Sequence, residues 1–440
     1  MDSKSVLKRG SLLSVPDNWP PEMSALFADR SSSELLRNLA VYKACSYSWL
    51  ANCTPSIIKA ASAVHLGTPL YAVIRRTLFR QFCGGENSED VKQAMESLQN
   101  KGIGVILDYA AEIDLSPLKT SAPESRDEAN SYHDGVRDNI IRAITTAKSS
   151  ANPFVAIKLT GLFENTTLEA LAKSNTNGNG KLALSDDLVI SYENGWNRLV
   201  SICEIAKESN VRLAIDAEQS FVQDAIDDIA LSAMQQYNGM NNSPEPLIVN
   251  TYQLYRKDGI DRLKSHLDRS KSTGFHFGAK LVRGAYVIGE RIWAEERKIT
   301  CPIFDTIQET HSSYDSAIDL VLNYVQDLPD SDHRRFLFIF ATHNEASIKK
   351  ATELYQRDFS LLSRMQICFA QLYGMSDVNS ISLAKAGYPV FKYLPYGPVK
   401  EVVPYLIRRS QENSSVFQLA KSDANLMWRE LKSRFFRGGS

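Results

Sequence analysis

Polar side chains that could do chemistry stand where short apolar runs of this sequence end. Seven of eight such runs close in this way, with Asp108, Lys158, Asp216 and Glu218, Gln253, Arg283, His343 and Asn344, and Tyr393. A lone Asp after a strand usually caps the next helix, and a lone His is more often a satisfied core residue than a catalyst. Many polar residues at equivalent positions indicate instead the rim of an enzyme site.

A second group of chemically useful residues lies in the run YLPYGPVKEVVPYLIRRSQEN, residues 393–413. Gly397 and Pro398 predict a turn, and the helix that follows brings Arg408, Arg409 and Glu412 within three or four residues of one another. A solvated charged face is the ordinary interpretation of that spacing. Adjacent guanidinium groups, however, recognise a carboxylate bidentately while a Glu balances the excess charge. An amino-acid zwitterion requires such a pattern.

The elements that must position these residues are eight apolar, β-rich runs separated by longer amphipathic helical stretches. The runs cover residues 103–108, 154–160, 212–218, 247–253, 278–283, 336–344, 367–372 and 389–394. They are continuously apolar rather than alternating, as is typical of parallel strands covered by helices. We therefore expect an α/β fold, a (βα)8 TIM-like barrel with its active residues at the carboxyl ends of the strands. An open doubly wound sheet is the alternative.

The segments around the barrel indicate three parts. Residues 31–101 form an N-terminal helical region, in which Asn87 is placed to cap a helix that ends at Gly102. The expected domains are 1–101, helical with a possible targeting remnant, 102–420, the catalytic barrel, and 421–440, a basic tail. We expect the tail to fray, and the apolar helices between 40 and 75 to pack against the barrel rather than face a membrane.

Composition excludes several classes of function. Lys and Arg total 50 against 51 for Asp and Glu, a balance that argues against a nucleic-acid partner. The six cysteines contain no C-x-x-C pair, so neither a disulfide framework nor a zinc site is indicated. A metal-dependent barrel hydrolase needs a cluster of carboxylates and histidines, and only His343 is well placed for one, so we expect no metal. A degenerate barrel that serves as a binding protein remains a further alternative.

Nine motifs in consistent order resemble the proline dehydrogenase family, in its stand-alone mitochondrial form found in eukaryotes. They are FCGGEN (82–87), VAIKLTGL (155–162), LAIDAEQS (213–220), VNTYQLY (249–255), KLVRGAY (280–286), ATHN (341–344), QLYGM (371–375), YLPYGP (393–398) and LIRRSQEN (406–413). The resemblance implies a distorted (βα)8 barrel that holds FAD non-covalently. It also implies oxidation of L-proline to Δ1-pyrroline-5-carboxylate, with electrons passed to ubiquinone or another membrane acceptor. The expected location is mitochondrial, in the matrix or peripherally on the inner membrane.

The same resemblance assigns the site residues by matching position. On the substrate side it implies that Lys158, Arg408 and Arg409 hold the carboxylate, that Tyr286, Leu372 and Tyr393 wall the ring, that Asp216 and Glu412 lie near the substrate, and that Glu112 pairs with an active-site arginine. On the flavin side it implies Gln253, Lys280, Val282, Gly284, Thr342, His343 and Asn344. The residues themselves suggest that Lys280 and Arg283 supply cations for pyrophosphate and that Gly284 lets the backbone approach a cofactor.

The chain departs from bacterial relatives in the motif KLVRGAYV, residues 280–287, where the two cations are exchanged and Val287 replaces an aromatic residue. A bidentate arginine contact thereby becomes a point charge at Lys280. Within the family, the hydroxyproline-specific branch replaces the tyrosine at the position of Tyr393 by a smaller residue. The intact Tyr393 therefore favours proline, and hydroxyproline dehydrogenase is the alternative.

Overall fold

The computed structural model describes residues 27, 30–45, 67–110, 126–176, 184–239, 244–326, 334–357, 366–415 and 417–437. In these residues eight parallel strands close a barrel, in which each strand pairs with its neighbours in sequence and the first pairs with the last. The strands are β1 (Gly104–Tyr109), β2 (Phe154–Ile157), β3 (Arg212–Ile215), β4 (Ile248–Gln253), β5 (Phe277–Val282), β6 (Phe336–Ala341), β7 (Gln366–Leu372) and β8 (Val390–Tyr396). The predicted (βα)8 fold is confirmed.

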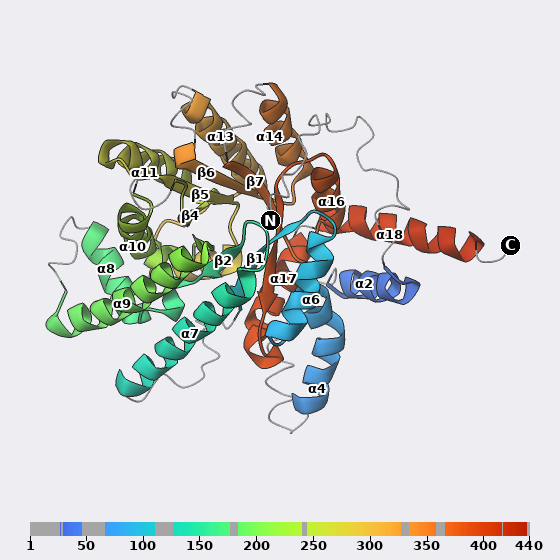
Figure 1. Ribbon diagram of the computed structural model, residues 1–440, viewed down its shortest axis with the longest axis horizontal. Coiled ribbons are helices and arrows are strands. Elements are labelled where there is room, and N and C mark those ends of the chain that lie inside the picture. Colours follow the sequence, from blue (N-terminus) through green and yellow to red (C-terminus); the bar gives the residue numbers. More distant parts are fainter. Residues whose placement is uncertain are drawn as a thin grey trace, which may run out of the picture.

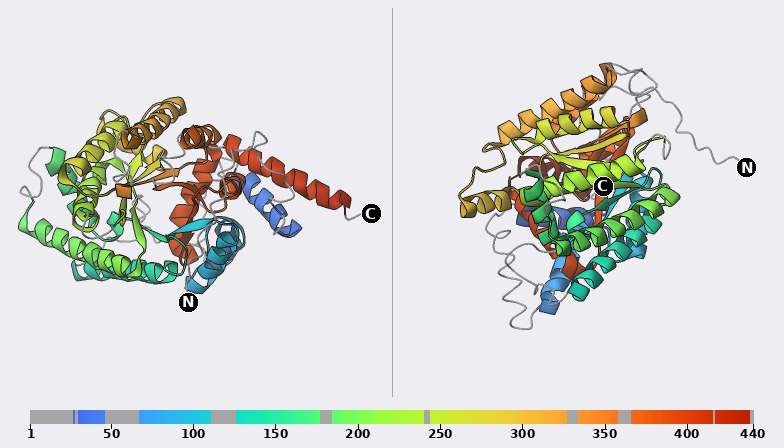
Figure 2. Two further views of the ribbon diagram at one scale, coloured as in Figure 1. Left: turned by 45° about the horizontal axis from the view of Figure 1, so that its top comes forward. Right: turned by 90° about the vertical axis from the view of Figure 1, so that its left-hand side faces the viewer.

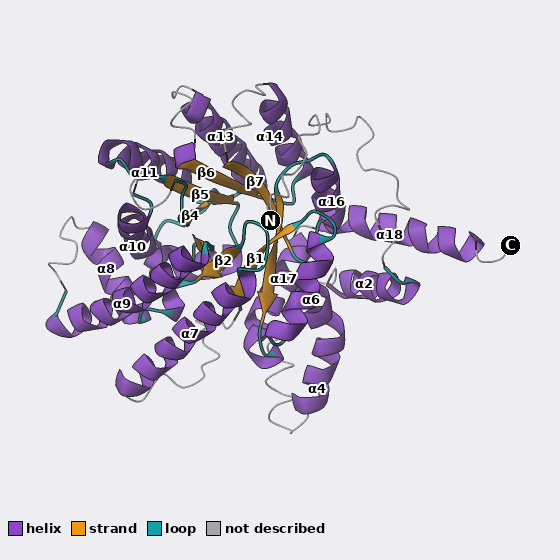
Figure 3. Ribbon diagram, viewed as in Figure 1, coloured by secondary structure: helices purple, strands orange, loops and turns teal. Residues whose placement is uncertain are grey.

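Helices surround the strands on the outside (Figures 1 and 3). Those that follow the strands are α7 (Arg126–Ala147), α8 (Asn165–Thr176), α9 (Asp186–Ser209), α10 (Ser220–Tyr237), α11 (Gly259–Thr273), α12 (Val287–Arg297), α13 (Ile307–Gln326), α14 (Glu345–Arg357), α16 (Asp377–Lys385) and α17 (Val399–Ser415), with a 3₁₀ turn η2 (Leu159–Gly161). Before the barrel lie α2 (Ser32–Cys45), α4 (Gly67–Ile74), the π-helical turn η1 (Arg75–Phe79), α5 (Arg80–Phe82) and α6 (Ser88–Gln99), and α18 (Phe417–Arg437) ends the described chain.

The two-residue period of the strands produces the layers inside the barrel. Inward-facing Phe154, Ala156, Ala214 and Phe391 belong to an apolar interior cluster, in which the Phe154 and Phe391 rings meet edge to face at 5.1 Å. Continuing the same alternation past β2 and β3 brings Lys158 and Asp216 into the next layer. Apolar side chains therefore fill the barrel interior along the strands, and polar groups follow at the carboxyl ends of the strands.

Four strands end earlier than predicted and two end later. β2, β3 and β6 stop before their polar residues, so that Lys158, Asp216 and His343 lie on the loops just beyond the strands. The predicted run ended at Leu394. β8 instead continues to Tyr396, and the carbonyl of Pro395 accepts a hydrogen bond from the backbone N–H of Gly84 at 2.8 Å.

The N-terminal helices pack on the barrel in the part that is described. Leu35 of α2 is fully buried, and the hydroxyl of Tyr42 donates to the Gly374 carbonyl in the turn after β7 at 2.7 Å. Asn87 caps α6 as predicted, because its side-chain oxygen accepts from the backbone N–H groups of Glu89 and Asp90 at 3.0 Å each. Residues 46–66, which the predicted apolar stretch includes, lie outside the described residues.

The expectation that the C-terminal tail frays is wrong for residues 421–437, which belong to helix α18. α18 extends away from the barrel beside α2 (Figure 2). Arg434 donates hydrogen bonds to the carbonyl groups of Phe27 and Arg30 at 2.7 and 2.5 Å, and Met427 is buried. The prediction rested on the position and positive charges of the tail, whereas the burial of Met427 in the hydrophobic core holds α18 in place.

No described helix has the length and apolarity needed to cross a membrane.

Candidate active site

A cluster of polar residues at the ends of five strands, β1, β2, β3, β5 and β8, occupies the carboxyl-end layer of the barrel interior. Lys158 Nζ lies 3.2 Å from the Tyr393 hydroxyl and 3.4 Å from carboxylate oxygens of both Asp108 and Asp216. The Tyr393 hydroxyl donates to Asp216 Oδ2 at 2.7 Å, and Lys280 forms a salt bridge with the other oxygen of Asp216. The structure thus brings together Lys158, Asp216, Lys280 and Tyr393 from the predicted set.

The charges inside this cluster fix its protonation state. Burial by itself would raise the pKa of Asp216, but the ammonium groups of Lys280 and Lys158 outweigh it and lower the pKa to about 2. Burial, together with the negative charges of Asp108 and Asp216, raises the pKa of Tyr393 well above its ordinary value. Asp216 is therefore ionised and Tyr393 is a neutral hydrogen-bond donor across the physiological range.

Two lysines face two carboxylates, so the cluster is close to electrically neutral by itself. Lys158 is shared between Asp108 and Asp216 at long distances rather than held tightly by either. An anion that enters the barrel can therefore draw on Lys158, but it needs further positive charge for full compensation. The arginines of α17 are the candidates for that charge.

Leu372 and His343 form the neighbouring part of the barrel mouth. Leu372 at the end of β7 is paired with Tyr393 of β8, and its backbone N–H donates to His343 Nε2 at 3.0 Å. Burial, followed by the charges of Lys392 and Arg409, lowers the pKa of His343 to about 3. A neutral imidazole that accepts at Nε2 carries its proton on Nδ1, so His343 retains one donor.

The two predicted arginines of α17 lie on this side of the barrel. Arg408 stacks over the ring of Tyr286, with its guanidinium carbon 5.0 Å from the ring centre, and both residues belong to the predicted set. Arg409 is buried and stacks on Tyr405 at the same distance. The side chain of Glu412 and the whole of Glu112 lie outside the described residues.

The residues predicted for the flavin do not all point to the same place as Arg283, which was predicted to bind pyrophosphate together with Lys280. Gln253 and Val282 are paired neighbours at the ends of β4 and β5, and Gln253 Oε1 is buried without a hydrogen-bond partner among the described residues. Arg283 instead points between the strands and the outer helices, where it contacts Thr342 at 2.5 Å and Ser347 at 2.8 Å. Lys280 and Arg283 thus address different places, which argues against their acting as a pair on one pyrophosphate.

Structural contacts occupy three other predicted flavin residues. A Cβ atom on Gly284 would lie 2.5 Å from the ring of Tyr255, and Gly284 has a φ of 137°, so this position requires glycine for packing alone. Thr342 accepts from Arg283 and from the backbone N–H of Asn344. Asn344 in turn accepts from the Ser347 N–H at 3.0 Å, as a cap for α14 does. Contact of these residues with a cofactor remains a prediction.

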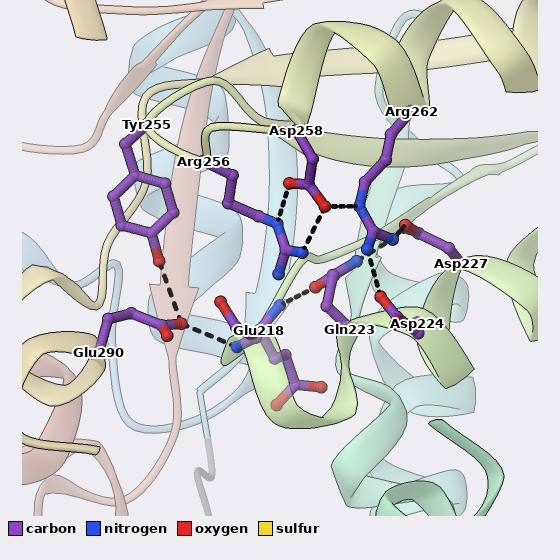
Figure 4. Close-up of polar contacts among 10 residues, drawn as sticks. Glu218, Gln223, Asp224, Asp227, Tyr255, Arg256, Asp258, Arg262 and Glu290 are labelled. Atoms are coloured by element: carbon purple, nitrogen blue, oxygen red, sulfur yellow. Dashed lines mark hydrogen bonds and ion pairs between the residues drawn. The ribbon is translucent and has the colours of Figure 1, made fainter. Parts of the chain in front are cut away.

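A polar network joins three loops at the carboxyl ends of the strands (Figure 4). Glu290 of α12 accepts from the backbone N–H of Ser220 at 2.7 Å and lies 3.5 Å from the Tyr255 hydroxyl. In another part of the same network, Arg256 and Arg262 both donate hydrogen bonds to the carboxylate of Asp258. The network ties the loop that carries Asp216 to the loop that carries Tyr286, so it fixes the distance between two parts of the candidate site.

Sequence reasoning missed the role of Asp108. Its position at the end of the first run was noted, but no motif drew attention to it. Asp108 is buried and pairs with Lys158 across the β1–β2 ladder. The signal was available, because polar residues that end two adjacent parallel strands on the same face must lie close together.

In the described part of the chain, no group of three His, Cys, Asp or Glu side chains could hold a metal ion. A closed (βα)8 barrel with lysines, aspartates and a tyrosine at the carboxyl ends of its strands is the architecture of a barrel enzyme.

The comparisons with known proteins define which enzyme family this is. The family model described as proline dehydrogenase matches residues 91–421. The chain belongs to the proline dehydrogenase family and is accordingly an oxidoreductase.

Relatives with two different names resemble the chain at similar levels. "Proline dehydrogenase 1, mitochondrial" of Dictyostelium discoideum is 32% identical over 450 residues, which cover 94% of this chain and 75% of that protein. "Hydroxyproline dehydrogenase" of Xenopus laevis is 30% identical over 432 residues, which cover 93% of this chain and 89% of that protein. Relatives from Dictyostelium discoideum, Caenorhabditis elegans and Arabidopsis thaliana are mitochondrial by name, and this confirms the expected mitochondrial location.

Among solved structures, proline utilization A (PutA) from Bdellovibrio bacteriovorus, inactivated by N-propargylglycine, aligns with a TM-score of 0.63 at 18% identity. The alignment covers 89% of this chain and 38% of that chain, so this chain matches a little over a third of the PutA length. At this identity the likeness supports the barrel fold alone.

Proposed function

We propose that this protein uses FAD to oxidise L-proline to Δ1-pyrroline-5-carboxylate and passes the electrons to ubiquinone or another membrane acceptor. The observation that carries the proposal is the polar cluster of Lys158, Asp216 and Tyr393 beside the apolar wall of Leu372, inside the barrel mouth. Proline combines a carboxylate, a ring of methylene groups and an amine. A site for it needs cations, apolar walls and a nearby acidic or neutral acceptor.

The charges of the cluster support binding of a zwitterion. Lys158 is already shared by two carboxylates, so Arg408 and Arg409 supply the additional charge for the substrate carboxylate. The predicted assignment of all three cations to that carboxylate is consistent with this balance. Asp216 stays ionised beside the Tyr393 hydroxyl and keeps that hydroxyl oriented toward the barrel interior.

The residues present fit a flavin. Gln253 offers a buried amide oxygen that lacks a partner among the described residues, and His343 keeps a donor on Nδ1. Val282, beside Gln253, presents an apolar contact. These three residues would hold FAD. Bound FAD would accept the hydride, which carries both electrons of the amine-to-imine oxidation, while the N–H proton is released separately.

Substitution of Arg409 by Met tests the carboxylate assignment. Removing a buried guanidinium contact costs about 2–5 kcal/mol, so Arg409→Met is expected to raise the KM for proline by at least about tenfold while FAD stays bound. Arg429→Met, which changes an exposed arginine of α18, is the matched control and keeps the wild-type KM. An unchanged KM in Arg409→Met would place the carboxylate elsewhere.

Hydroxyproline is the second candidate substrate, because relatives that carry either name match this chain. Tyr393 faces the barrel interior, and its hydroxyl donates to Asp216. We infer that this phenol leaves less room for a ring hydroxyl on the substrate than a smaller side chain would. We therefore expect kcat/KM to be higher for L-proline than for trans-4-hydroxy-L-proline in steady-state assays. Faster oxidation of hydroxyproline would reverse this choice.

A further inference from the structure

A cavity of about 180 Å³ lies outside the barrel wall, between the N-terminal helices and the β7–α16 turn. It is separated from the barrel interior by the barrel wall, because it is lined from α2, α5 and α6 on one side and from α16 and the outer face of β8 on the other. None of the residues assigned to proline or FAD lines it.

The lining of this cavity is strongly basic. Five cations, Arg30, Arg37, Arg80, Lys101 and Lys392, face it together with two carboxylates, Glu34 and Asp377. Asp377 is already engaged, because it forms salt bridges with both Arg30 and Lys392. Glu34 accepts hydrogen bonds from the backbone and hydroxyl of Ser31 at the start of α2. Glu34 also interacts electrostatically with Arg37 and Arg80. With five cations against two carboxylates, positive charge remains in excess.

Donor groups in the lining lack acceptors. In the described part of the chain, Arg30 Nη1 and Arg37 Nε are buried without a hydrogen-bond partner. Among the described residues, Arg37 makes one long hydrogen bond, to Asn38 at 3.5 Å. Neither Arg37 nor Arg80 has a described carboxylate within salt-bridge distance. Burial and the neighbouring charge of Arg80 both lower the pKa of Arg37. Buried guanidinium donors without an acceptor are costly, and an anion would remove the cost.

We propose that this cavity is a binding site for a phosphate group. Its volume suits a small tetrahedral anion, and convergent guanidinium forks are the groups that recognise phosphate oxygens best. The phosphate could belong to a free ion or soluble phosphomonoester, or to the headgroup of an anionic lipid, and both sources offer the same chemistry to Arg37 and Arg80.

The cavity and the candidate active site lie back to back on the same two strands. Lys392 points into the cavity while its neighbour Tyr393 points into the barrel, and Tyr373 lines the cavity directly after Leu372. The Gly374 carbonyl between the two regions accepts from Tyr42 and Gln81. A ligand in the cavity therefore contacts the outer surface of the wall that holds Leu372 and Tyr393.

Titration of the full chain with inorganic phosphate tests the proposal, at ionic strength held constant with sodium chloride. We expect phosphate to raise the melting temperature of the wild type in a saturable way. Arg37→Met and Arg80→Met should each weaken phosphate binding by at least about tenfold. Neither substitution breaks a salt bridge to a described residue, and Arg80 is exposed, so both variants are expected to fold. Arg76→Met, at an exposed position of η1 outside the cavity, is the matched control and should bind like the wild type.

Vesicles distinguish the two sources of the phosphate group. If a lipid headgroup fills the site, the wild type should co-sediment with phosphatidylcholine vesicles that contain phosphatidic acid, and Arg37→Met should not. Inorganic phosphate should then release the wild type from the vesicles. Saturable binding of phosphate without vesicle binding indicates a soluble ligand. The proposal is overturned if phosphate produces no saturable shift, or if the shift is the same in the wild type, Arg37→Met and Arg80→Met.

Discussion

At the scale of single residues, the candidate site depends on shared charges rather than on isolated pairs. Asp216 accepts from Tyr393 and from two lysines, and Lys158 divides its contacts between Asp216 and Asp108. Removal of one partner from such a buried group leaves the others uncompensated. Substitutions within the cluster should therefore change binding and stability together.

The pKa of Asp216 predicts how stability depends on pH. Its value of about 2 in the folded protein lies below the ordinary value of about 3.9. A lowered folded pKa contributes stability above the unfolded pKa, and this contribution is lost as the pH falls through the folded pKa. The contribution amounts to about 2–3 kcal/mol, and we expect it to disappear between about pH 4 and pH 2.

Denaturant unfolding at several pH values, on the wild type and on Asp216→Asn, measures this contribution. The free energy of unfolding of the wild type should fall more steeply below pH 4 than that of the variant. Parallel curves for the two proteins would show that Asp216 is not held ionised by its neighbours.

At the scale of elements, the loops after β3 and β5, which carry Asp216 and Tyr286, are fixed by contacts that the sequence does not display. Gly284 lies in the loop that leads to Tyr286, and it packs against Tyr255 of the neighbouring β4 loop. Glu290 then joins the same loop to Ser220 (Figure 4). The position of Tyr286 therefore follows from packing between loops.

Substitution of Gly284 by Ala should destabilise the protein by about 1–3 kcal/mol, because the new methyl group overlaps the Tyr255 ring and the φ is unfavourable for alanine. Gly135→Ala is the matched control. Gly135 lies within α7 and an added Cβ meets nothing within 4 Å, so alanine there should stabilise by about 0.5–1 kcal/mol. Thermal unfolding of both variants checks the pair, and equal effects would contradict the assigned packing.

The strands and much of the central cluster could be predicted from the sequence, because the period of the apolar residues and the order of the apolar runs determine both. The eight apolar runs correspond to the eight strands, and the polar residues beyond them meet wherever their alternation points inward. The same alternation places Lys280 and Arg283, three positions apart, on opposite faces of the barrel wall, so the expected pairing of these two cations conflicts with the strand period. Contacts between distant segments, such as Gly284 with Tyr255, leave no local signal.

At the scale of the whole molecule, segments from the two ends of the chain pack together on one side of the barrel. α18 lies beside α2, and Arg434 closes the contact by donating to the carbonyl groups of Phe27 and Arg30 and to Glu430 (Figures 1 and 2). α2 in turn lines the basic cavity behind the barrel wall. Destabilisation of α18 should therefore destabilise the N-terminal region before it affects the barrel.

Arg434→Met tests the contact between the two ends of the chain. Loss of hydrogen bonds to two carbonyl groups and a carboxylate should lower stability by about 1–3 kcal/mol, and protease cleavage near α2 should become faster. Lys432→Met removes a neighbouring charge at an exposed position and should change stability by less than about 0.5 kcal/mol. Indistinguishable melting temperatures for Arg434→Met and the wild type would show that the contact carries no stability.

We propose that the polar cluster in the barrel mouth holds proline against a bound flavin. The most direct test of this proposal is the visible absorbance spectrum of the purified protein, recorded without oxygen before and after addition of L-proline. We expect an oxidised flavin band that bleaches on addition of L-proline and stays unchanged on addition of D-proline at the same concentration. A protein reconstituted with FAD that shows the band but does not bleach with L-proline would contradict it.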